Sequence, residues 1–137
     1  YSPDRGRMFF HSSSYTANPI ACAAAAANLE IWATEPVHER VASLAARQAA
    51  RIASFRNDKR LLNARQAGTI TALDLSAEGA GYLASVAPGL YSFFTERGFL
   101  LRPLGNTIYV MPPYCTTESE LDSLYAAIAE AATAVKP

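Results

Sequence analysis

The stretch LRPLGNTIYVMPPY, residues 101–114, decides the fold class that the sequence predicts. Its apolar, β-branched and aromatic residues favour short strands over Phe99–Arg102 and Thr107–Met111. The residues between them, 103–106, include proline, glycine and asparagine, which are typical of turns. We therefore predict an antiparallel hairpin whose arms are these two strands and whose connection is residues 103–106.

Helices are predicted on both sides of this hairpin. Before it, a helix starts near Ser85 and stops at Gly98, because glycine commonly terminates helices. After it, Thr117 and Glu120 have the spacing of a capping box, which marks a helix start. The last helix has an apolar face with residues three and four positions apart. These residues are Leu121, Leu124, Tyr125, Ile128 and Ala132.

Toward the N-terminus the pattern is again mainly helical. Asn18 is a good N-cap and Pro19 suits the first helical turn, so a helix is predicted to run to residue 31 or 32. A second helix follows and carries an apolar stripe that Gln48 interrupts. The stripe consists of Val37, Val41, Leu44, Ile52 and Phe55.

One more strand, Thr69–Leu75, is predicted after the second helix because β-branched residues are frequent there. Residues 1–17 are polar and are expected to form a loop with a short strand at residues 8–10. The element order is helix, helix, strand, helix, strand, strand, helix. This order predicts an α+β fold, in which a small, mostly antiparallel sheet is covered on one side by helices.

The composition excludes several functions. The formal net charge is zero, because twelve basic residues balance twelve acidic ones. The arginines are scattered, so the sequence shows no basic surface for nucleic acid or an anionic membrane. No apolar run has the length of a membrane span. The two cysteines, Cys22 and Cys115, lack metal-site spacing, and we expect free thiols in a reducing cytoplasm.

Two segments carry residues that could bind a ligand. In HSSSYTANPIACAA, residues 11–24, hydroxyl groups cluster before a helix N-terminus, an arrangement that can bind an anion. The same pattern fits an ordinary polar loop followed by an N-cap. In the second segment, Arg102 stands at a predicted strand end, where its guanidinium could bind a carboxylate or be solvated. The residues alone leave these alternatives open.

Together the two segments resemble the class III family of pyridoxal-phosphate-dependent aminotransferases, and the resemblance covers essentially the whole chain. The first motif, His-x-x-Ser/Thr-Tyr/Phe-x-x-Asn/His-Pro-x-Ala-Cys-Ala-Ala, is shared across the class. The second, Arg-Pro-Leu-Gly-Asn-x-Ile-Tyr-x-Met-Pro-Pro-Tyr, is narrower and resembles the members that act in biotin biosynthesis. The resemblance implies the C-terminal small domain of a fold-type I transferase. Residues 1–18 would be a loop of the cofactor-domain and dimer interface, and residues 19–137 the small domain with its leading helix.

The resemblance also implies roles for three residues. Ser14 matches the position that reaches the phosphate of pyridoxal 5'-phosphate in the partner subunit. Arg102 matches the arginine that pairs with the distal carboxylate of the substrate, and Tyr109 matches an aromatic hydroxyl in the same pocket. The implied reaction transfers an amino group from S-adenosylmethionine to 8-amino-7-oxononanoate, giving 7,8-diaminononanoate. Because Arg102 and Tyr109 stand on the two arms of the predicted hairpin, we expect them to face one cavity.

The lysines depart from the family pattern. The chain has only Lys59 and Lys136, whereas the family lysine that holds the cofactor as a Schiff base lies upstream of the 11–24 motif. We therefore expect the C-terminal part of a homodimeric enzyme, with no catalytic residue of its own and inactive alone. Two alternatives stay open: another class III aminotransferase acting on an ω-amino acid, and a non-catalytic binding or oligomerisation domain of the same fold.

Overall fold

The chain forms two compact units, residues 1–37 and residues 38–137, in a computed structural model. The residues that the structure describes are 5–7, 17–77 and 79–135. The strand predicted at residues 8–10 lies outside them.

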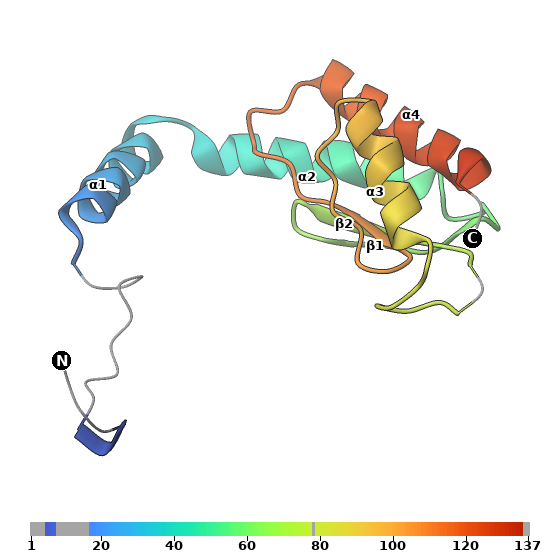
Figure 1. Ribbon diagram of the computed structural model, residues 1–137. Helices are drawn as coiled ribbons and strands as arrows, with labels where there is room; N and C mark the ends of the chain where they lie inside the picture. The colour runs from blue at the N-terminus through green and yellow to red at the C-terminus, as the bar shows by residue number, and fades with distance from the viewer. Residues whose placement is uncertain (1–4, 8–16, 78, 136–137) are drawn as a thin grey trace. The chain divides into compact units, whose positions relative to one another are not determined.

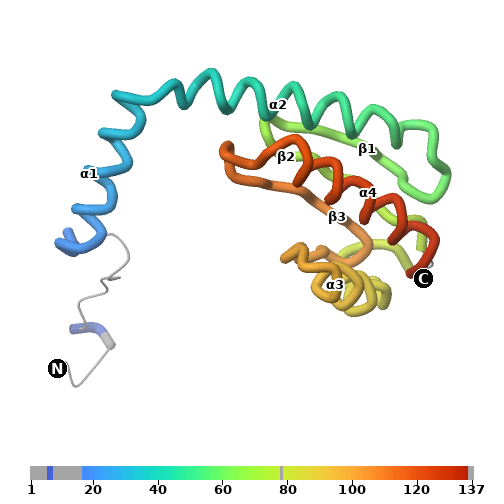
Figure 2. The backbone as a smooth tube through the Cα atoms, turned by 90° about the horizontal axis from the view of Figure 1, so that it is seen from above, coloured from blue at the N-terminus to red at the C-terminus, as the bar shows by residue number. Residues whose placement is uncertain are grey.

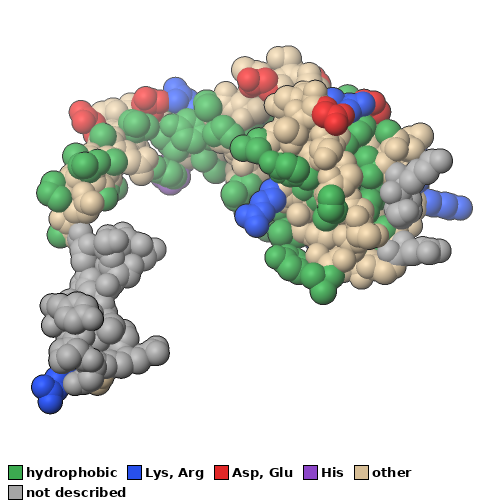
Figure 3. Space-filling model, in the orientation of Figure 1, with side chains coloured by type: hydrophobic (Ala, Val, Ile, Leu, Met, Phe, Trp, Pro, Cys, Tyr) green, Lys and Arg blue, Asp and Glu red, His purple; other side chains and the backbone are tan. Residues whose placement is uncertain are grey.

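The first unit contains the short 3-10 helix η1 (Arg5–Arg7) and the helix α1 (Pro19–Thr34), shown in blue in Figure 1. As predicted, Asn18 caps α1: its side chain accepts a hydrogen bond of 3.0 Å from the Ile20 amide. No residue of α1 is buried against the described part of the chain, and hydrophobic side chains lie on the surface of this helix (Figure 3). An apolar helix of this kind normally lies against other structure.

The second unit is built on a three-stranded antiparallel sheet in the order β1-β2-β3. Its strands are β1 (Leu61–Ala67), β2 (Ile70–Leu75) and β3 (Thr107–Val110). The predicted strands over 69–75 and 107–111 are therefore confirmed. The strand β1 is not predicted, because Leu61 is its one fully buried residue and a bulge interrupts its pairing after residue 62.

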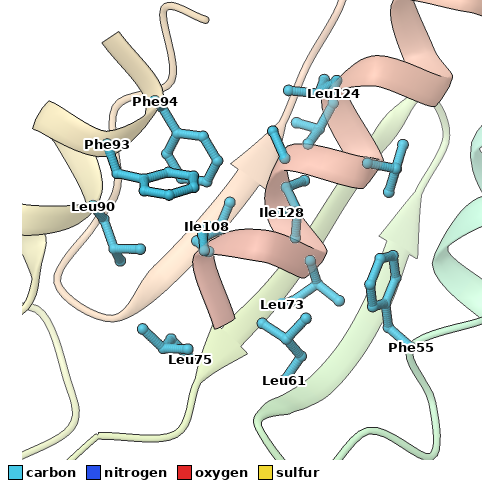
Figure 4. Close-up of a cluster of buried hydrophobic side chains, with 14 of the residues drawn as sticks. Phe55, Leu61, Leu73, Leu75, Leu90, Phe93, Phe94, Ile108, Leu124 and Ile128 are labelled. Atoms are coloured by element: carbon cyan, nitrogen blue, oxygen red, sulfur yellow. The ribbon is translucent and has the colours of Figure 1, made fainter. Parts of the chain in front are cut away.

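Three helices complete the second unit: α2 (Val37–Ala53), α3 (Ala87–Glu96) and α4 (Glu118–Ala134). The predicted capping box at the start of α4 is present. Figure 2 shows α4 lying along the strands, and Figure 4 shows side chains of α3 and α4 meeting those of all three strands in one core. The sheet and its covering helices confirm the predicted α+β class.

The interruption of the α2 stripe at Gln48 has a structural reason. Gln48, Thr71 and Tyr125 form a buried polar cluster that joins α2, β2 and α4. The Tyr125 hydroxyl donates to Gln48 Oε1 at 2.5 Å, and Thr71 Oγ1 lies 2.6 Å from that hydroxyl. The Gln48 Nε2 donates to the carbonyl of Thr69. Each buried polar group thus has a partner, which is the condition for burying it without a large cost.

The strand predicted over 99–102 is wrong, and so is the hairpin. Residues 99–102 pair with no described strand, and β3 pairs with β2 instead. One isolated bridge, between Leu104 and Thr107, is all that remains of the predicted hairpin. Partly buried and exposed side chains nevertheless alternate along this segment, as they would in a strand. Phe99 and Leu101 are partly buried against the core, whereas residues 100 and 102 are exposed.

Both cysteines, Cys22 and Cys115, are free and exposed. No described helix is long and apolar enough to cross a membrane.

Candidate substrate-binding site

A cavity of about 350 Å³ lies between α3, the segment before the Leu104 bridge, and β3. Its lining consists of one basic residue, two tyrosines and three aliphatic or thioether side chains. These are Arg102, Tyr91, Tyr109, Leu100, Leu101 and Met111. The cavity therefore combines a single positive charge with mainly apolar walls, a combination that suits a carboxylate carried on an apolar chain.

The position of Arg102 follows from the end of α3. Gly98 has a φ of 80°, and its amide donates to the Thr95 carbonyl at 3.0 Å while the Phe99 amide donates to the Phe94 carbonyl at 2.9 Å. These two bonds are a Schellman motif, which needs glycine because L-residues with side chains avoid this backbone conformation. The chain then continues without regular secondary structure, and the alternation of partly buried and exposed residues after Phe99 leaves Arg102 exposed at the cavity.

Arg102 forms no hydrogen bond or ion pair with any described residue. By contrast, Arg51, Arg65 and Arg97 each pair with a carboxylate of their own chain. The Arg102 guanidinium thus keeps all its donors free for a ligand in this part of the molecule. A guanidinium can hold a carboxylate through two parallel hydrogen bonds.

The turn after Arg102 is fixed by two motif residues. The amides of Leu104 and Thr107 each donate to the other's carbonyl, at 2.9 and 3.0 Å, so Gly105 and Asn106 form a two-residue turn. Gly105 has a φ of 61°, and a Cβ on it would stand 1.8 Å from the Gly81 carbonyl oxygen. Glycine is therefore required here on both conformational and steric grounds.

Asn106 ties this turn to its neighbours. Its side chain accepts a hydrogen bond of 2.8 Å from the Gly81 amide and donates one of 2.8 Å to the Leu75 carbonyl. The Leu75 amide in turn donates to the Asn106 carbonyl at 2.8 Å. The Gly-Asn pair of the motif thus holds the end of β2 and the loop after it against the segment that carries Arg102.

Tyr109 reaches the same cavity from β3. Its neighbours Ile108 and Val110 are buried under the helices, so Tyr109 points to the opposite face of the sheet, beside its partner Ala72 on β2. Its hydroxyl has no hydrogen bond to a described residue. The structure therefore brings Arg102 and Tyr109 to one cavity although the predicted hairpin does not form. Their role in binding a substrate stays a prediction.

A second polar group lies nearby but is already satisfied. Asp74 accepts hydrogen bonds from Arg65, Asn63 and Thr107, at 3.0, 2.9 and 2.8 Å. Burial acts to raise the pKa of this carboxyl, but the hydrogen bonds, led by that from Arg65, hold its pKa below the ordinary value. The Asp74 carboxylate accepts these three hydrogen bonds and so joins β1 to β2 and β3, which commits it to the fold and not to a ligand.

Cofactor and metal ligands are not found around this cavity. Lys59 is exposed in the turn between α2 and β1, and it does not line the cavity; Lys136 and Ser14 lie outside the described residues. The described residues include no group of three histidine, cysteine or acidic side chains that could hold a metal ion.

The fold and motifs define a class of protein. The family model for class III aminotransferases matches residues 3–132, and the chain belongs to this family. It is 39% identical to the adenosylmethionine-8-amino-7-oxononanoate aminotransferase of Synechococcus elongatus over 94% of its length. It is 32% identical to the protein of the same name from Anoxybacillus flavithermus over 91% of its length. The chain spans about 30% of the length of these curated relatives.

Solved structures agree with this family. A crystal structure of adenosylmethionine-8-amino-7-oxononanoate aminotransferase from Methanocaldococcus jannaschii superposes with a TM-score of 0.73 at 27% identity, over 89% of this chain and 30% of that one. An ω-transaminase from Thermomicrobium roseum superposes with a TM-score of 0.78 at 24% identity, over 94% and 30% of the two chains. At that identity the second match shows the fold alone.

Proposed function

We propose that this chain is the C-terminal part of an aminotransferase of biotin biosynthesis. The intact enzyme would transfer an amino group from S-adenosylmethionine to 8-amino-7-oxononanoate and give 7,8-diaminononanoate. Family membership supports the reaction class, and the names of the relatives support this pair of substrates. In this proposal residues 1–18 belong to the cofactor-domain and dimer interface of a cytoplasmic homodimer, and residues 19–137 belong to the small domain.

One observation carries the proposal at the level of the structure: Arg102 lines an apolar cavity without a partner among the described residues. In the proposal its guanidinium pairs with the carboxylate of 8-amino-7-oxononanoate, and the Tyr109 hydroxyl donates a third hydrogen bond. The aliphatic lining accommodates the methylene chain of the substrate. The pair would fix one end of the substrate and so orient the keto group at the other end.

The cofactor of the proposed enzyme is pyridoxal 5'-phosphate, which supplies the electron sink for amino transfer. The described residues around the cavity do not fit it, because none of them is a lysine. Ser14 would contact the cofactor phosphate of the partner subunit. We therefore assign recognition of the substrate carboxylate to the described residues, and we expect the chain alone to be inactive.

The test uses the intact enzyme and the variant Arg102→Met. Hydrogen bonds to a charged group contribute about 1.5–3 kcal/mol, so kcat/KM for 8-amino-7-oxononanoate should fall roughly 10- to 150-fold, chiefly through KM. Arg102→Lys keeps the charge but loses the two-pronged geometry, and its loss should be intermediate. The matched control is Arg56→Met, which removes an exposed arginine that does not line the cavity.

A second substrate shows which atoms the arginine contacts. The carboxamide analogue of 8-amino-7-oxononanoate should be a poor substrate of the wild-type enzyme. Its kcat/KM should fall little further in Arg102→Met, because the change in the substrate and the change in the protein remove the same interaction. If the two changes lowered kcat/KM by fully additive free energies, the proposed pairing of Arg102 with the substrate carboxylate would be contradicted. Use of ω-amino acid donors in place of S-adenosylmethionine would favour another class III aminotransferase. Failure of the intact protein to bind the cofactor would favour a non-catalytic domain.

A further inference from the structure

The helix α3 contributes Tyr91 to the cavity, a residue to which neither the motifs nor the proposed function gives a role. Three other residues of α3, namely Leu90, Phe93 and Phe94, are buried in the core. Tyr91 lies beside this buried face and is 45% exposed. Its hydroxyl makes no hydrogen bond with a described residue, so the side chain is not needed to satisfy a buried group.

The element that presents Tyr91 is fixed at its C-terminal end. The Arg97 guanidinium pairs with Glu130 of α4, with nitrogen–oxygen distances of 2.6 and 3.3 Å. The same guanidinium lies 3.6 Å from the centre of the Phe93 ring. Together with the Schellman motif at Gly98, these contacts hold α3 to the core. A wall residue on such an element can define the width of a cavity better than one on a loop.

The chemistry of the lining indicates what Tyr91 would contact. Arg102 would bind the carboxylate end of a ligand, and Tyr109 lies on the sheet side of the cavity. Tyr91 stands on the helix side, with Leu100 and Met111 completing the apolar wall. A tyrosine ring offers a large, rigid apolar surface with a polar tip.

We propose that Tyr91 is a specificity-determining residue of this site. Its ring packs against the methylene groups next to the carboxylate held by Arg102 and excludes substrates that are branched there. This inference rests on the proposed function, because it assumes that a carboxylate substrate occupies the cavity.

The experiment compares two substrates in the intact enzyme: 8-amino-7-oxononanoate and its 2-methyl derivative, which is branched beside the carboxylate. The measured quantity is the ratio of kcat/KM for the branched substrate to that for the linear one. One methyl or methylene group in a well-formed pocket changes this ratio by about 10- to 200-fold. Tyr91→Ala should therefore raise the ratio about tenfold or more, through a lower KM for the branched substrate.

Two further variants separate the ring from other effects. Tyr91→Phe keeps the ring and should keep the wild-type ratio, whereas Tyr91→Trp enlarges the ring and should lower the ratio. The matched control is Tyr82→Ala, which removes a tyrosine that is 73% exposed and does not line the cavity. Because a general loss of stability affects both substrates alike, it leaves the ratio unchanged.

The outcomes distinguish the two proposals. If the intact enzyme does not aminate the linear substrate, the proposed function fails. If it does, and the ratio is the same in Tyr91→Ala, Tyr91→Trp and wild type, the role of Tyr91 is overturned while the proposed function stands. Opposite shifts of the ratio in the alanine and tryptophan variants would support the role of the ring.

Discussion

Replacing Tyr125 with phenylalanine removes one hydroxyl from the buried polar cluster of Gln48, Thr71 and Tyr125. That hydroxyl donates to Gln48 Oε1 at 2.5 Å and lies 2.6 Å from Thr71 Oγ1. The phenylalanine ring would keep the stacking on Phe55, whose ring centre lies 6.0 Å from that of Tyr125. The substitution therefore tests the hydrogen bonds and leaves the packing of the ring in place.

The expected cost follows from what stays buried. After the substitution Thr71 Oγ1 keeps a contact of 3.3 Å to Gln48 Oε1, and both groups lose their shorter bond. A hydrogen bond within the fold contributes about 0.5–1.5 kcal/mol to stability, so the loss of both shorter bonds costs about 1–3 kcal/mol. We expect the free energy of unfolding of the second unit to fall by this amount.

Equilibrium urea unfolding of the 137-residue chain, followed by far-ultraviolet circular dichroism, measures this change. Fluorescence is less suitable, because the single tryptophan, Trp32, lies in the first unit. The control is Tyr82→Phe, which removes an exposed hydroxyl and should change the free energy of unfolding by less than about 0.5 kcal/mol. If Tyr125→Phe is no more destabilising than this control, the cluster does not stabilise the fold as we argue.

The same variant has a characteristic pH dependence. Burial raises the pKa of Tyr125 above the ordinary value of 10.0, although the hydrogen bond from Thr71 acts in the opposite direction. The unfolded chain therefore loses this proton at a lower pH than the folded chain does. The stability contributed by the neutral phenol is complete below pH 10 and is lost as the pH rises through the folded pKa. The difference in stability between the wild type and Tyr125→Phe should consequently narrow above pH 10.

Three further substitutions test local features. Gly105→Ala should destabilise the second unit by more than about 2 kcal/mol in urea unfolding, because its Cβ would collide with the Gly81 carbonyl and its φ is positive. Thr117→Ala should cost about 0.5–2 kcal/mol in the same assay, because it removes the N-cap of α4. Hydrogen bonds from Arg60 lower the pKa of Asp58 from 3.8 to about 2, so this carboxylate stabilises the fold above pH 3.8 and ceases to do so as the pH falls toward 2. In Asp58→Asn the melting temperature should therefore change less with pH between 3.8 and 2 than it does in the wild type. At neutral pH the substitution should lower the free energy of unfolding by less than about 1 kcal/mol, because Arg60 is half exposed.

The elements that the sequence predicts best have local signals. Asn18 and the Thr117 capping box mark helix starts through bonds within a few residues, and Gly98 marks a helix end in the same way. The strand β1 carries no such signal, because its polar residues face solvent and its pairing depends on β2. The segment 99–102 has the alternation of a strand but no partner, and a partner is a property of the tertiary structure.

The residues of the candidate site also divide into those that a local motif identifies and those that only the tertiary structure reveals. Arg102 and Tyr109 could be identified from the motif, and the turn residues Gly105 and Asn106 explain why the motif has that spacing. Tyr91 could not be identified, because it reaches the cavity only through the packing of α3 on the core. The bond between Arg65 and Asp74 could not be predicted either, since it depends on the unpredicted pairing of β1 with β2.

The polar cluster has a consequence for synthesis of the protein. Gln48 and Tyr125 are 77 residues apart in sequence, and α4 supplies one layer of the core. A nascent chain on the ribosome would therefore have completed the β1–β2 hairpin long before the helix that covers the sheet emerges. During that interval the inner face of the strands would be open to chaperones, and the second unit would close only once α4 has emerged.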